Sequence, residues 1–176
     1  MQTGIREEDF TIQRYSMTSI LTQSKSKILV IVPCSKKKVW DKFPNSGSVY
    51  AKDAYVSSYF KLCRKYAEKF GNSWVILSAK YGFIRPDFVI PTNYDVSFNN
   101  SKGKVVSTQK LKEQARGLRF QRYKSIIVLG GKQYVQISKN VLEGYGVQII
   151  VPLESLGIGK RQAKIKKALA KGIPLI

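Results

Sequence analysis

The sequence predicts an α/β fold, a single Rossmann-like three-layer domain with a parallel sheet of about four strands and helices on both faces. Four short segments are almost entirely aliphatic or β-branched, and unbroken apolar runs of this length favour parallel strands that are covered on both sides. The segments between them repeat apolar residues at helical spacing, so the connections are right-handed crossovers in a doubly wound sheet. The predicted strands cover 28–32, 74–77, 126–129 and 147–151.

The helices are predicted from apolar stripes and from residues that favour helix ends. The first helix lies between the first two strands, with Asp53 as its N-terminal cap and Gly71 at its end. Cys63 falls on its apolar stripe, so we assign this cysteine to the core. The later helices are expected over 108–121, directly after Gly130-Gly131, and over 159–171.

Two parts of the chain lack such periodicity. The connection from Ala79 to Ser107 is about 28 residues long without a clear element, and loops of that length in compact domains are usually functional. Residues 1–24 are polar and weakly patterned. We therefore expect a flexible N-terminal extension over 1–24, followed by one α/β domain over 25–176.

Charge is the most unusual feature of the composition. Lysine and arginine number 31 against 11 aspartate and glutamate residues, which gives a net charge of +20. Such an excess costs self-repulsion unless a polyanion offsets it, so we expect nucleic acid (RNA or DNA) or a nucleotide as partner. A generally basic proteome is the alternative. Basic stripes are predicted on the second helix (Lys112, Arg116, Arg119) and on the fourth (Lys160, Lys164, Lys167, Lys171).

The composition also excludes several classes of protein. The chain has no histidine, so no imidazole can act as a catalytic base. Cys34 and Cys63 are its two cysteines, which provide neither a zinc site nor a disulfide framework, and we expect no metal and no cofactor. No run of about 18 apolar residues indicates a membrane span. The first residues lack a hydrophobic signal core, so we expect a cytoplasmic protein.

Small residues stand beside lysine after each predicted strand. Ligands of parallel sheets bind at the carboxyl ends of the strands, where glycine and serine expose backbone N–H groups and lysine adds charge. We therefore expect the four loops to meet at one edge of the sheet and to bind phosphate or base, although each alone is also compatible with a tight turn or solvated lysines. The expected binding residues are Ser35, Lys36, Lys37, Ser78, Tyr81, Gly82, Tyr94, Gly130, Gly131, Tyr134, Gly157, Gly159 and Lys160.

Five residues of these loops are candidates for catalysis. Lys38 and Lys80 are expected to stabilise developing negative charge or to act as a nucleophile. Asp95 and Glu154 are expected to orient a base or move a proton, with local salt bridges as the alternative. Cys34 follows a proline among lysines that would stabilise a thiolate, although an ordinary turn cysteine is the more common case.

Together these loops resemble those of an uncharacterised domain family found in archaea, bacteria and phages. Its members share a PCS-and-lysine first loop, an SAK-aromatic-Gly second loop followed by a YD pair, a glycine-containing third loop and a closing PLxxLGIG. The resemblance covers about residues 27–170 and implies a fold without an established activity. The matching segments here are Pro33-Cys34-Ser35 with Lys36 to Lys38, Ser78-Ala79-Lys80-Tyr81-Gly82, Tyr94-Asp95, Gly130-Gly131, and Pro152-Leu153 with Leu156-Gly157-Ile158-Gly159.

The first loop also resembles the catalytic domain of archaeosine synthase, which modifies a 7-deazaguanine base in transfer RNA and is similar in fold to uracil-DNA glycosylases. That family opens with Pro-Cys, three residues and Lys, as do Pro33, Cys34 and Lys38. It continues with Pro-Tyr and ends in histidine, whereas this sequence has Val39-Trp40 and no histidine. The resemblance implies chemistry on a nucleobase.

The leading hypothesis is a nucleobase- or nucleotide-modifying enzyme, transferase or glycosylase-like, that acts on nucleic acid without a metal. Tyr81 and Tyr134 would stack on a flipped base. One alternative is a non-catalytic, basic nucleic-acid-binding module, whose affinity would collapse with salt and which would tolerate single loop substitutions. The other is a small-nucleotide-binding sensor, whose binding would depend far less on salt.

Overall fold

The computed structural model describes residues 27–99 and 104–176, so the predicted extension over 1–24 lies outside the described residues. A five-stranded sheet with the order β4-β3-β1-β6-β7 forms the centre of the domain. Four of its strands run parallel, as predicted: β1 (Ile28–Pro33), β3 (Ser73–Ser78), β6 (Ser125–Val128) and β7 (Gln148–Ile150). The fifth, β4 (Gly82–Ile84), is antiparallel and pairs with β3 at the edge.

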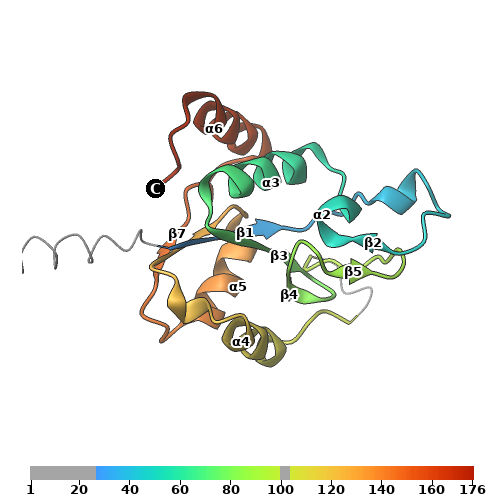
Figure 1. The fold of residues 1–176 in the computed structure, drawn as a ribbon, viewed down its shortest axis with the longest axis horizontal. Helices are drawn as coiled ribbons and strands as arrows, with labels where there is room; N and C mark the ends of the chain where they lie inside the picture. Colours follow the sequence, from blue (N-terminus) through green and yellow to red (C-terminus); the bar gives the residue numbers. More distant parts are fainter. Residues whose placement is uncertain (1–26, 100–103) are drawn as a thin grey trace, which may run out of the picture.

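Helices cover both faces of this sheet (Figure 1). One face carries α3 (Ser58–Phe70) and α6 (Ile158–Lys171), and the other carries α4 (Thr108–Gly117) and α5 (Lys132–Leu142). Along β1, Val30 packs on the first side and Ile31 on the second, and both are buried, which explains the unbroken apolar run. The predicted Rossmann-like three-layer fold is confirmed. No helix in the described part of the chain is long and apolar enough to cross a bilayer.

The first helix begins later than predicted. Asp53 is not its cap, because this residue lies in a separate short helix, α2 (Ala51–Ala54), and pairs with Arg64 at 2.8 Å. The backbone is extended at Tyr55, where it forms an isolated bridge with Lys38, and α3 starts only after this interruption. The Ser57 side chain is the actual cap and accepts a hydrogen bond from a backbone N–H of the first turn.

The long connection contains regular structure that the sequence pattern does not indicate. It includes β4 and also β5 (Val89–Ile90), which pairs antiparallel with β2 (Val49–Tyr50) in a small second sheet. The expectation that this connection has no clear element is therefore wrong. Strands of two or three residues are too short to produce a recognisable alternation, and their pairing with distant segments decides their conformation.

The second helix ends earlier than predicted, at Gly117, and is followed by a 3₁₀ turn over Phe120–Arg122. The reversal is made by Arg119, which adopts a left-handed conformation with φ 55° and ψ 50°. Among the described residues, no other non-glycine residue has a positive φ. This position after a helix end usually holds glycine, and a larger residue costs about 1 kcal/mol there.

Candidate functional site

The strand order brings the predicted loops to one edge of the sheet. The strands β1, β3, β6 and β7 are parallel, so their carboxyl ends share that edge. The chain moves from β1 to β3 on one side and later adds β6 on the other side of β1. This reversal of strand order beside β1 is the position where ligands of open α/β sheets bind.

A cavity of about 400 Å³ lies where the loop after β1 meets the long connection. Two of its residues were not predicted: Asp41, whose carboxylate accepts a hydrogen bond from the Lys38 backbone N–H at 2.8 Å, and Asn93, whose amide donates to Asp41 at 3.4 Å. We call this cavity the Lys38 pocket. Its lining residues are Lys36, Lys38, Asp41, Asn93, Tyr94 and Asp95.

Lys38 is the most unusual residue of this pocket. It is only 3% exposed, whereas Lys36 and Lys37 beside it are exposed. Its Nζ donates a hydrogen bond to the Lys36 carbonyl at 3.0 Å and lies 4.3 Å from the centroid of the Tyr94 ring. Burial lowers the pKa of the Lys38 amine, and the negative charges of Asp41 and Asp95 oppose this shift only in part. The neutral, nucleophilic amine is therefore more accessible than in an ordinary lysine.

Tyr94 connects the loops that follow β1 and β3. Its hydroxyl is hydrogen-bonded to Tyr55 and, at 3.0 Å, to Ser78, and burial raises the pKa of Tyr94 to about 12. The Nζ of Lys80 lies 5.0 Å from the centroid of the same ring that Lys38 faces. The two candidate lysines thus share one aromatic ring, and Asp95 is held next to it by the chain.

Ser78 and Tyr81 support this arrangement from the β3 side. Ser78 is fully buried, and its hydroxyl oxygen accepts hydrogen bonds from the backbone N–H groups of Lys80 and Tyr81 at 3.3 and 3.2 Å. The Ser78 hydroxyl therefore holds the turn after β3. The Tyr81 ring packs edge-on against Tyr94, with 5.3 Å between the ring centroids.

Cys34 lies at the end of β1 but is not placed as a thiolate. Its Sγ is 3.3 Å from the Tyr134 hydroxyl. Burial raises the pKa of the Cys34 thiol, although the Tyr134 hydrogen bond and the Lys38 charge partly oppose this. Burial raises the pKa of Tyr134 as well. A thiol with a raised pKa is a poor nucleophile at neutral pH, so this geometry favours Lys38 over Cys34 as the reactive group.

The third loop packs closely against its surroundings. A Cβ atom at Gly130 would collide with the Tyr134 side chain, and one at Gly131 would collide with the guanidinium of Arg161. Arg161 was not predicted as a site residue. Its Nε donates to the Leu153 carbonyl at 3.2 Å, so it connects the loops after β6 and β7. The sequence does not distinguish Arg161 as a site residue, because α6 contains many other basic residues.

Other predicted residues lie along the same edge without contacting the Lys38 pocket. Gly157 is the N-cap of α6, and Gly159 and Lys160 lie exposed in its first turn. The carboxylate of Glu154 is 3.7 Å from the Lys139 ammonium, which is the local salt bridge considered above as its alternative role. Within the described ranges, no three cysteine, aspartate or glutamate side chains gather as metal ligands would.

Two comparisons with known proteins found a match, to a family model and to one relative. The model of a family of unknown function, DUF6884, matches residues 29–167. The uncharacterized protein YfjM of Bacillus subtilis (strain 168) is 40% identical over 144 residues, which cover 81% of this chain and 95% of that protein. No solved structure matches the chain. The chain belongs to DUF6884, a family of unknown function.

Proposed function

We propose that this protein is a nucleobase-modifying enzyme that acts on nucleic acid, with Lys38 as its nucleophile. The observation that carries the proposal is a lysine that is 3% exposed and borders a cavity of about 400 Å³ at the edge where the parallel strands end. A desolvated lysine amine is a well-suited nucleophile, because less of it is protonated. The net charge of +20 favours a polyanionic substrate.

In the proposed step, Lys38 replaces the base at the sugar carbon C1′. The lone pair of Lys38 Nζ forms a bond to C1′ while the bond between C1′ and the base breaks, and the base leaves with that electron pair. The amine proton passes to Asp95, which lines the same cavity as Lys38. Lys80, whose Nζ also lies near the Tyr94 ring, stabilises the negative charge of the departing base. Water then releases the sugar in a glycosylase, or a second base does so in a transferase.

The spacing of the first loop supports action on a nucleobase within nucleic acid. Pro33, Cys34 and Lys38 match the opening motif of the archaeosine synthase catalytic domain, whose reaction is carried out on a base in transfer RNA. The lysine of that motif is the residue that is buried here. Flipping a nucleotide into the pocket would bring its C1′ to Lys38, as base-modifying enzymes require.

The test is to incubate the protein with total bacterial RNA and with sheared genomic DNA, and to quantify all nucleosides by mass spectrometry. We expect one nucleoside to decrease. When the sugar ring opens, the C1′ adduct becomes an imine, so added borohydride should reduce it to a stable bond on the Lys38 peptide. A Lys65→Gln variant, altered at an exposed position on α3, serves as the control and should retain both signals. Unchanged nucleosides together with no adduct would contradict the proposal.

The rate should also depend on pH in a defined direction. Burial lowers the pKa of Lys38 from the usual value of 10.5 for lysine, and the neutral amine is the reactive form. We therefore expect kcat/KM to rise with pH and to reach its plateau below pH 10.5. The measurement is a rate profile from about pH 6 to about pH 11. A rise centred at or above the ordinary lysine value would show that the reacting amine is not desolvated.

A further inference from the structure

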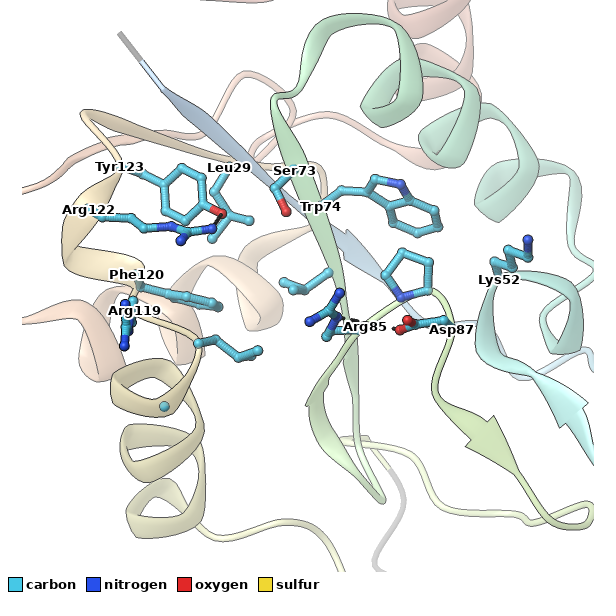
Figure 2. A pocket seen from close by; sticks show the side chains of 14 residues that line it. Leu29, Lys52, Ser73, Trp74, Arg85, Asp87, Arg119, Phe120, Arg122 and Tyr123 are labelled. Carbon is cyan, nitrogen blue, oxygen red and sulfur yellow. Dashed lines mark hydrogen bonds and ion pairs between the residues drawn. The ribbon is translucent and has the colours of Figure 1, made fainter. Parts of the chain in front are cut away.

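A second concave surface lies on the outer edge of the sheet, away from the Lys38 pocket. The strand β4 pairs only with Ile76, Leu77 and Ser78, so among the described residues no strand covers the outer edge of β3 from Ser73 to Val75. A groove of about 550 Å³ occupies this position. Figure 2 shows that it extends from the end of α4 and the following turn to the segment after β4.

The groove is strongly basic, and we call it the arginine groove. Its lining includes four cations, Lys52, Arg85, Arg119 and Arg122, and one carboxylate, Asp87. Asp87 is 3.5 Å from Arg85, which leaves the other three cations in excess. Among the described residues, no carboxylate lies within ion-pair distance of Arg119 or Arg122. Arginine presents a planar set of donors that matches phosphate oxygens.

Two of these arginines are positioned by the fold. Arg122 donates a hydrogen bond to the Tyr123 hydroxyl at 3.2 Å, and its guanidinium carbon lies 5.3 Å from the centroid of that ring (Figure 2). Arg119 has the left-handed conformation with φ 55°, at a position where glycine would be free of strain. The turn would form more easily with glycine, so the strained arginine at this position points to a use for its side chain.

We propose that the arginine groove binds the phosphate backbone of the nucleic acid at a distance from the modified nucleotide. The identity of the partner rests on the proposed function, whereas the location of this surface does not. Ser73 beside the groove and Ser78 beside the Lys38 pocket are the two ends of β3, about 17 Å apart along the strand. A substrate that reaches both sites must therefore be a chain of several nucleotides, because a single nucleotide cannot span that distance.

The test measures binding of fluorescein-labelled single-stranded DNA by anisotropy, with oligonucleotides of about 4 and about 16 nucleotides. We expect Arg119→Gly to weaken binding of the longer strand by about three- to tenfold and to reduce the slope of log affinity against log salt by about 0.7, the value for one lost phosphate contact. Binding of the short strand should change less, because a strand held in the Lys38 pocket has fewer phosphates that can reach the groove. Arg122→Gln should behave in the same way, and Arg119→Lys should keep most of the affinity.

Two controls separate loss of contact from loss of fold. Arg119→Gly relieves the strained conformation, so its midpoint of thermal unfolding should equal that of the wild type or exceed it by about 2 to 4 °C. Lys65→Gln removes one positive charge from α3, outside the groove, and should weaken binding by less than about twofold.

The proposal is overturned if Arg119→Gly and Lys65→Gln have the same affinity and salt slope, or if oligoglutamate of equal charge competes as well as DNA, which would assign the groove to acidic peptides. Either result leaves the nucleoside assay intact. Conversely, a protein that changes no nucleoside but binds the long strand through Arg119 would overturn the proposed function alone.

Discussion

Replacing Lys38 with methionine is expected to abolish the proposed activity, by at least about 10³-fold in kcat, while the protein stays folded. Methionine is flexible, apolar and similar in length, so it fills the space of the lysine stem without a charge. Because Lys38 is only 3% exposed and its pKa is lowered by burial, removing the charge also removes a cost of folding. We expect the free energy of unfolding to equal the wild-type value or to exceed it by up to about 1 kcal/mol.

The size of this gain in stability depends on pH. A lysine whose pKa is lowered in the folded state binds fewer protons there than in the unfolded chain, so the wild-type stability should rise with pH between the two pKa values. Lys38→Met should lack this rise. Urea unfolding at neutral and at alkaline pH measures it, alongside single-turnover rates.

Two further substitutions make this prediction discriminating. Lys38→Arg keeps a positive charge but cannot provide a neutral amine, so it should be inactive. Lys37→Met changes an exposed neighbour in the same lysine run and should raise KM by less than about tenfold without abolishing kcat. Measurable turnover by Lys38→Arg would rule out a nucleophilic amine and assign Lys38 to charge stabilisation.

The largest loss of stability is expected from Gly82→Ala. Gly82 has φ 77°, and a Cβ atom there would collide with the side-chain amide of Gln114. That amide accepts a hydrogen bond from Phe83 N–H at 2.9 Å and donates one to the Tyr81 carbonyl at 2.8 Å, which ties the turn before β4 to α4. We expect the substitution to lower the free energy of unfolding by about 2 to 4 kcal/mol, from backbone strain and displacement of Gln114.

A matched glycine separates the two causes of this loss. Gly144 has φ 81°, but an added Cβ there would meet no atom within 4 Å, so Gly144→Ala should cost only about 1 kcal/mol of strain. In a Gln114→Ala background the cost of Gly82→Ala should fall towards the same value. Urea unfolding of these variants provides the measurement. Equal losses at Gly82 and Gly144 in the wild-type background would show that Gln114 does not hold the turn.

The predictable parts of the fold are those whose structure is indicated by the residues of one continuous segment. The residues of β1 are apolar at every position because both faces are covered, and Gly71 ends α3 as its sequence indicates. Asp53 shows the limit of such signals. Aspartate is a good capping residue, yet the bridge between Tyr55 and Lys38 separates Asp53 from α3. The helix therefore begins later, with Ser57 as its N-terminal cap. Local propensity was outweighed there by a contact between distant residues.

The candidate site shows the same division. The sequence by itself determined that four strands are parallel and that their small-residue and lysine loops share one edge, because crossover connections allow little else. Only the tertiary structure decided which of three consecutive lysines is buried, and that Lys38 and Lys80 both lie near the Tyr94 ring. It also decided that Arg119 and Arg122 border one groove with Arg85. Desolvation, and therefore the reactivity of a lysine amine, depends on what packs around the side chain. Three consecutive lysines in a sequence do not indicate which of them is buried.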